Sequence, residues 1–120
     1  MIIPLRVLIV EDNPDDAELI ILHLVNAGFQ ADWQRVETEA DFLSALESLP
    51  DLILSDWSLP HFSGLRALKL HNERGLNIPF VIVSGSIGEE IAIDALHNGA
   101  DDYVLKDRPA RLGESVRRVL

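Results

Sequence analysis

Acidic, hydroxyl and amine side chains lie where four short apolar segments of the chain end. Glu11 and Asp12 follow the first segment, Asp56 follows the second, Ser84 ends the third and Lys106 ends the fourth. Clustered carboxylates repel one another, and they stay ionised together only if a cation lies among them. Oxygen ligands without imidazole or thiolate favour Mg²⁺, or Mn²⁺, over zinc.

This set of side chains also fits phosphate chemistry. Magnesium is bound in proteins through one or two carboxylates, keeps water ligands and usually accompanies phosphate. A lysine and a serine then donate hydrogen bonds to phosphoryl oxygens, and an aspartate attacks phosphorus. Taken singly, each residue has a plainer explanation as a solvated loop acid, helix cap, turn residue or surface charge. Their placement at successive segment ends predicts a phosphoryl-acceptor site.

The four apolar segments have the length and composition of strands in a parallel sheet that is covered on both faces. They are residues 5–10, 51–55, 79–84 and 102–106, all expected in the centre of the sheet. A fifth segment, residues 30–36, is mixed and polar, which is typical of an edge strand.

Helical patterns separate these segments. Asn13 is a good N-cap for a first helix that ends at Gly28, and Thr38 opens a second. The other three helices are expected from Leu65 to Gly75, over 88–98, and from Pro109 onward. Five strand–helix units joined by right-handed crossovers predict a doubly wound α/β fold. Ligands of such sheets bind at the carboxyl ends of the strands, where the reactive side chains lie.

Composition limits the classes of function. The chain has 120 residues, enough for one domain, and a formal net charge of −10, which argues against direct nucleic-acid binding. It has no cysteine, so disulfides, thiolate metal sites and cysteine nucleophiles are excluded. No apolar run reaches the roughly 18 residues of a membrane span, and a cytoplasmic location is expected.

Four stretches resemble the signature blocks of response regulator receiver domains of two-component signalling, in that family's order. They are VLIVEDNPDDAELI, DLILSDWSLPHFSGL, FVIVSGS and GADDYVLK. The resemblance covers essentially the whole chain. It implies one receiver domain over residues 1–120 with a flavodoxin-like, five-stranded parallel sheet of order 2-1-3-4-5.

The resemblance implies a role for each residue at the strand ends. Asp56 corresponds to the phosphoacceptor, which takes a phosphoryl group from a phosphohistidine on a partner kinase. Asp12 corresponds to a direct Mg²⁺ ligand together with Asp56 and the backbone carbonyl of Ser58, while Glu11 acts through water. Lys106 pairs with the Asp56 carboxylate and later with the phosphoryl group.

The family also implies a conformational switch. Ser84 moves to hydrogen-bond the phosphoryl group, and Tyr103 changes rotamer as Ser84 moves. The face formed by the fourth helix, fifth strand and fifth helix then changes for a downstream effector or a homodimer partner. The implied protein is a signalling receiver rather than an enzyme, and its phosphodonor is a histidine kinase or phosphotransfer protein.

One departure and three alternatives accompany this resemblance. Lys106 is followed by Asp107 and not directly by proline, so a trans bond is expected and Lys106 is expected to rest on other contacts. An aspartyl phosphatase needs an acid two residues after its nucleophile, where Ser58 stands. SGSIG (84–88) only half-matches a hydrolase nucleophile elbow. A degenerate receiver that only binds partners is disfavoured by the complete residue set.

Three further expectations concern the remainder of the chain. The fifth helix ends on an apolar residue without a cap, which suggests a domain cut from a larger protein, with a single-domain regulator left open. The four histidines share no metal-binding spacing and are expected on the surface. Arg111, Arg117 and Arg118 give the last helix a basic face, either simply solvated or part of a partner surface.

Overall fold

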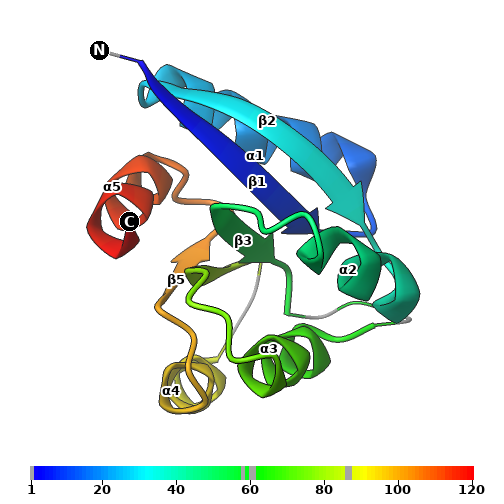
Figure 1. Ribbon diagram of the computed structural model, residues 1–120. Coiled ribbons are helices and arrows are strands. Elements are labelled where there is room, and N and C mark those ends of the chain that lie inside the picture. The colour runs from blue at the N-terminus through cyan, green and yellow to red at the C-terminus, as the bar shows by residue number, and fades with distance from the viewer. Residues whose placement is uncertain (1, 58, 60–61, 86–87) are drawn as a thin grey trace.

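The computed structural model describes residues 2–57, 59, 62–85 and 88–120, and within them five strands alternate with five helices (Figure 1). In chain order the elements are β1 (Ile3–Val10), α1 (Pro14–Asn26), β2 (Phe29–Val36), α2 (Glu39–Leu46), β3 (Leu52–Ser55), α3 (Gly64–Glu73), β4 (Phe80–Ser84), α4 (Glu89–His97), β5 (Asp102–Leu105) and α5 (Ala110–Val119). The predicted alternation is confirmed. Within this described part, no helix is long and apolar enough to span a bilayer.

The strands form one parallel sheet in the order β2-β1-β3-β4-β5. This confirms the doubly wound fold, and it puts β2 at an edge, as its polar pattern predicts. The order 2-1-3-4-5 implied by the family resemblance is confirmed, with β5 at the other edge, so the central position expected from the apolar composition of residues 102–106 alone is wrong. Its apolar character has a different cause. Val104 belongs to the core under α5, whereas Tyr103 packs against the core on the opposite face.

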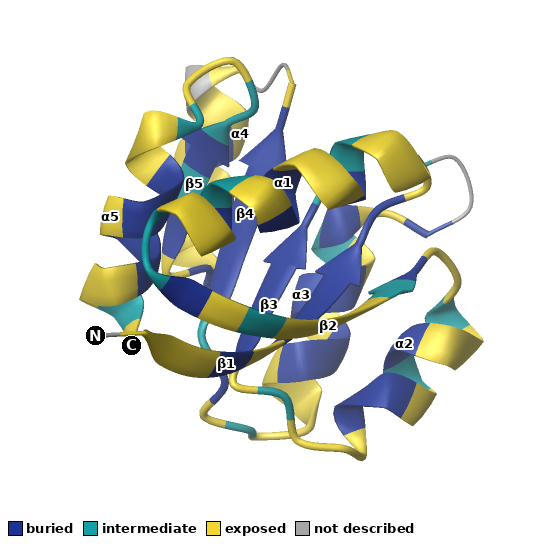
Figure 2. Cartoon of the chain, turned by 90° about the horizontal axis from the view of Figure 1, so that it is seen from above, coloured by how far each residue is buried: buried dark blue, intermediate teal, exposed yellow. Residues whose placement is uncertain are grey.

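Helices cover both faces of the sheet, so there are two apolar cores (Figure 1). Side chains alternate between the faces along each strand. Ile9 packs with Leu24 of α1 and Val116 of α5, whereas its neighbour Leu8 lies in the core with Phe42 of α2 and residues of α3 and α4. Strands β3 and β4 are buried throughout, and β2 is largely exposed (Figure 2).

Capping side chains fix where the first three helices begin. Asn13, Thr38 and Ser63 each accept hydrogen bonds from backbone N–H groups of the following first turn. Gly28 and Gly99 follow the ends of α1 and α4 with φ of 100° and 108°, a backbone region that favours glycine. These signals are local, which is why the helix positions are predictable from sequence.

One histidine departs from its expected place on the surface. His71 is only 6% exposed, and its Nε2 donates a hydrogen bond to the carbonyl oxygen of Ile78 at 2.7 Å. Its ring also packs against Phe80, with 5.6 Å between ring centroids. His71 is therefore a core residue that satisfies the backbone between α3 and β4.

The basic face of α5 makes intramolecular contacts. Arg117 donates a hydrogen bond to the carbonyl of Ala27 at the end of α1, and its guanidinium carbon lies 5.7 Å from the ring centroid of Phe29. Gly113 allows this approach, because a Cβ there would lie 2.6 Å from the Cβ of Ala27. At least part of the basic face therefore attaches α5 to α1.

Asp102 attaches α5 to the sheet. Its side chain is 10% exposed, pairs with Arg118 and accepts a hydrogen bond from Ser115 Oγ at 2.6 Å. Burial acts to raise the pKa of Asp102, but hydrogen bonds from Ser115, the Tyr103 N–H and Arg118 outweigh it and hold the pKa below its ordinary value. The folded state therefore favours the ionised carboxylate.

This network makes a prediction about stability and pH. Asp102→Asn should lower the free energy of unfolding at pH 7 by about 2 kcal/mol, because a charge-assisted network loses its anion. Since folding depresses the pKa of Asp102, its contribution is complete above the unfolded-state value. It is lost as pH falls through the folded-state value. The difference between variant and wild type should thus shrink from pH 7 toward about pH 3 in urea unfolding curves.

Asp107, an exposed acid just beyond the other end of β5, provides the control, because Asp107→Asn removes the same charge. That variant should unfold like the wild type at both pH values. A destabilisation by Asp102→Asn that is equally large at both pH values would contradict the assignment to the ionised carboxylate.

Candidate functional site

Four of the predicted site residues, Glu11, Asp12, Asp56 and Lys106, meet at the carboxyl-terminal edge of the sheet, where Ser84 ends β4. Hydrogen bonds between strands continue past the strand ends: Asp56 N–H donates to the carbonyl of Val10 at 2.9 Å, and Lys106 N–H donates to the carbonyl of Ser84 at 2.9 Å. Glu11 is held in the same way by β2. The backbone of the site is thus an extension of the sheet.

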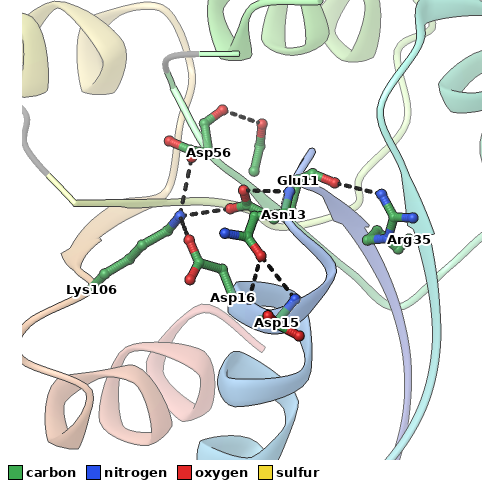
Figure 3. Close-up of polar contacts among 8 residues, drawn as sticks. Glu11, Asn13, Asp15, Asp16, Arg35, Asp56 and Lys106 are labelled. Carbon is green, nitrogen blue, oxygen red and sulfur yellow. Dashed lines mark hydrogen bonds and ion pairs between the residues drawn. The ribbon is translucent and has the colours of Figure 1, made fainter. Parts of the chain in front are cut away.

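Lys106 lies at the centre of the cluster (Figure 3). Its Nζ lies 2.7 Å from Glu11 Oε2, 2.8 Å from Asp16 Oδ2 and 3.1 Å from Asp56 Oδ2. The predicted pairing of Lys106 with Asp56 is present, and the expectation of other contacts for Lys106 is met by Asp16. The Lys106–Asp107 peptide bond is trans, as the sequence predicts.

Burial and charge oppose each other at this cluster. Burial raises the pKa of Glu11 to about 7, although the hydrogen bond from Lys106 and the N–H of Asn13 act to lower it. Burial also acts to lower the pKa of Lys106, but hydrogen bonds to Asp16 and Glu11 and the charge of Asp56 raise it above its ordinary value. The ammonium is therefore charged at neutral pH, and it compensates part of the carboxylate charge.

Three carboxylates of the cluster could hold a metal ion. One oxygen from each of Glu11, Asp12 and Asp56 lies within 4.8 Å of the others. Glu11 is buried, Asp56 is intermediate and Asp12 is exposed, so the group opens to solvent on one side. Oxygen donors that leave room for water ligands fit Mg²⁺. The predicted fourth ligand, the backbone carbonyl of Ser58, lies outside the described residues.

The two predicted switch residues lie on one face of the sheet. Ser84 ends β4 and is 2% exposed. Tyr103 pairs in register with Ile82, two residues before Ser84, and packs partly buried against the core that contains Ile82. In-register and i+2 residues share a face. A shift of Ser84 would therefore change the packing around Tyr103. A rotamer change itself stays a prediction.

Two residues of the site, Asp16 and Gly64, are not predicted from the sequence. Asp16 contacts Lys106 directly, yet an acid in the first turn of a helix has a common explanation as a partner of the helix dipole. Gly64 is not among the predicted site residues, and its role is steric. A Cβ at Gly64 would lie 2.5 Å from the carbonyl oxygen of Asp56 and 2.8 Å from the Cα of Trp57. The start of α3 therefore packs directly against the backbone of Asp56 and Trp57.

Comparisons with known proteins agree with this geometry. A sequence model of the family described as response regulator receiver domain matches residues 7–117. The phosphate regulon transcriptional regulatory protein PhoB of Klebsiella pneumoniae is 38% identical over 125 aligned positions, covering 95% of this chain and 52% of that protein. The virulence transcriptional regulatory protein PhoP of Salmonella choleraesuis is 31% identical over 115 positions, covering 96% and 50%.

A solved structure has the same fold. NtrX from Brucella abortus superposes with a TM-score of 0.85 at 25% identity, over 98% of this chain and 27% of that one. The chain spans about half the length of the curated relatives it matches. The sheet order, the acidic cluster beside a lysine and the family match agree: the chain belongs to the response regulator receiver domains of two-component signalling.

Proposed function

We propose that the chain is a phosphorylation-dependent switch in which Asp56 accepts a phosphoryl group from a histidine kinase or phosphotransfer protein. The observation that carries this proposal is the position of the Lys106 ammonium, 3.1 Å from Asp56 Oδ2, within a cluster whose carboxylates of Glu11, Asp12 and Asp56 are suited to a divalent cation. A nucleophile, a fixed cation and a metal-binding set at one sheet edge are the parts that phosphoryl transfer requires.

The transfer needs no further reactant. A carboxylate oxygen of Asp56 forms the new P–O bond, and the P–N bond to the donor imidazole breaks with its electron pair remaining on nitrogen. Lys106 donates hydrogen bonds to the phosphoryl oxygens as negative charge shifts onto the acceptor side. A bound Mg²⁺, held by Asp12, Asp56 and Glu11 through water, would supply charge neutralisation at the same oxygens.

The response to phosphorylation would also begin at the carboxyl-terminal edge of the sheet. The phosphoryl group adds about −1.5 to −2 charges and three acceptor oxygens, and the Ser84 hydroxyl moves to donate to one of them. That movement changes the packing of Tyr103 and the face of α4, β5 and α5. An effector that binds one state of this face better reads the switch. We place the domain in the cytoplasm, within a longer regulator like its relatives.

A homodimer through α4, β5 and α5 is a second form of output that one observation favours. Ile91, Ile93 and Leu96 of α4 are 43%, 45% and 37% exposed, which is a concentration of apolar surface on one helix. The same proposed face includes α5, which carries Arg111, Arg117 and Arg118 in an otherwise acidic protein. Such a mixed surface is suited to a partner with both apolar and charged groups.

The test is Mg²⁺-dependent labelling. The protein incubated with acetyl phosphate and Mg²⁺ should gain the mass of one phosphoryl group by intact mass spectrometry. Hydroxylamine should remove it, because acyl phosphates are cleaved and serine phosphates are not. Asp12→Ala should need at least about tenfold more Mg²⁺ for half-maximal labelling, since a direct ligand is lost. The exposed Asp94→Ala, which removes an equal charge from α4, is the control.

Each part of the proposal can be contradicted by a separate result. A label that resists hydroxylamine, or no label at all, would exclude Asp56 as phosphoacceptor. Labelling with an unchanged Mg²⁺ requirement in Asp12→Ala would leave the acceptor standing but remove Asp12 from the metal site.

A further inference from the structure

The hydrogen bonds of Lys106 account for every donor that its ammonium has. An ammonium carries three N–H donors, and Nζ has three carboxylate acceptors, in Glu11, Asp16 and Asp56, at 2.7, 2.8 and 3.1 Å. Glu11 and Asp56 belong to the trio suited to a cation, and Asp56 is also the proposed nucleophile. Asp16 is the acceptor that has neither of these tasks.

The backbone that carries Asp16 is held in place by its neighbours. It lies in the first turn of α1, where the side chain of Asn13 accepts the N–H of Asp15 at 2.9 Å and of Asp16 at 3.3 Å. The next residue, Ala17, is completely buried against the sheet. The Asp16 carboxylate is thus presented to Lys106 from an element that is independent of the strand carrying Asp56 (Figure 3).

Packing alone does not hold the stem of Lys106. A small open pocket of about 50 Å³ lies beside it, lined also by Asp16, Ile20, Pro109 and Leu112. Tightly packed side chains are held by their neighbours, but a lysine stem beside open space has other rotamers available. The contacts of its ammonium group must therefore decide where the cation lies.

We propose that Asp16 is a positioning residue for phosphoryl transfer: it keeps the Lys106 ammonium over Asp56 when the other carboxylates are engaged elsewhere. The inference rests on the proposed function. A cation in the carboxylate trio competes with Lys106 for the oxygens of Glu11 and Asp56. After transfer, the charge of Asp56 moves onto the phosphoryl group, and one donor of Lys106 follows it. Asp16 keeps its hydrogen bond through both steps.

The kinetic test compares Asp16→Ala with Asp15→Ala. Both remove one acid from the same helical turn, so the effects on net charge and helix dipole match, but only Asp16 contacts Lys106. With acetyl phosphate, Asp16→Ala should lower the maximal labelling rate about tenfold, a size typical of lost positioning contacts. The half-saturating concentrations of Mg²⁺ and acetyl phosphate should change less than about twofold, because Asp16 touches neither. Asp16→Asn keeps an acceptor oxygen, so its maximal labelling rate should lie between those of Asp16→Ala and the wild type.

A spectroscopic test reads Lys106 directly. The chain has two lysines, Lys69 and Lys106, and Lys69 is exposed on α3. In protein labelled with ¹³C-lysine, the two Cε protons of an immobilised Lys106 should give separate signals, whereas those of Lys69 should coincide. Asp16→Ala should merge the Lys106 pair, and Asp15→Ala should leave it split. A residue that served only the stability of α1 would not produce this difference.

The outcomes separate the inference from the function on which it rests. Equal labelling rates and equal Lys106 signals in Asp16→Ala and Asp15→Ala would overturn the inference while wild-type labelling upholds the function. A slower Asp16→Ala with an unchanged Lys106 signal, or a faster one, would overturn it as well. Absence of hydroxylamine-sensitive label on the wild type would instead remove the proposed function.

Discussion

Asp56→Asn should abolish the hydroxylamine-sensitive phosphoryl label, with a rate at least about a thousandfold below that of the wild type. An amide oxygen is a far weaker nucleophile than a carboxylate oxygen. The variant keeps the shape of the side chain and an acceptor for Lys106, which stays bonded to Glu11 and Asp16. Intact mass spectrometry over a time course measures the effect.

The stability of the Asp56→Asn variant shows whether the label is lost because the nucleophile is missing or because the fold is disturbed. Asparagine removes one charge from a crowded acidic cluster, which offsets the weaker bond to Lys106. We therefore expect its free energy of unfolding to remain within about 1 kcal/mol of the wild type. Asp94→Asn, an exposed change on α4, should label normally. Persistent label on Asp56→Asn, still released by hydroxylamine, would move the acceptor to another carboxylate, with Asp12 the first to examine.

Gly64→Ala should destabilise the fold by about 3 kcal/mol and also slow labelling. The added methyl would lie 2.5 Å from the carbonyl oxygen of Asp56 and 2.8 Å from the Cα of Trp57. Both neighbours are backbone atoms, which cannot rotate away, so either α3 or the segment carrying Asp56 must shift. Helix propensity acts in the opposite direction, because alanine is better than glycine inside a helix by about 1 kcal/mol. We expect the steric clash to outweigh this gain, so the net change in the free energy of unfolding is a decrease.

Gly88→Ala is the matched control for this change. Gly88 also adjoins the start of a helix, and a Cβ there would meet nothing within 4 Å. It should cost less than about 1 kcal/mol, the difference between glycine and alanine at a helix cap. Urea unfolding followed by circular dichroism compares the two, and the labelling rate shows whether Asp56 has moved. A more stable Gly64→Ala protein would mean that helix propensity dominates and that the close contact relaxes without cost.

Much of the site was predictable because its residues occupy equivalent places along the chain. Glu11, Asp12, Asp56, Ser84 and Lys106 each end or follow a short apolar segment. In a parallel sheet all such ends share one edge. Convergence of these side chains therefore follows from the strand pattern, with no knowledge of any contact. The same local signals, caps and glycines, placed the helices within a few residues.

Other features depend on partners far along the chain, and the sequence pattern does not contain them. Asp102 stands at the start of a predicted strand, and its contacts with Ser115 and Arg118 join it to residues that lie 13 and 16 positions away. His71 resembles a surface histidine until the carbonyl of Ile78 and the ring of Phe80 are placed around it.

The sequence by itself determined the alternation of strands and helices, the edge of the sheet where the candidate site lies, and the residue types that meet there. These follow from periodicity and from the geometry of parallel strands. Only the tertiary structure decided that Asp16 reaches Lys106 and that Gly64 leaves no space behind Asp56. Each of these depends on distances between elements, and such distances are set by how whole helices pack on the sheet.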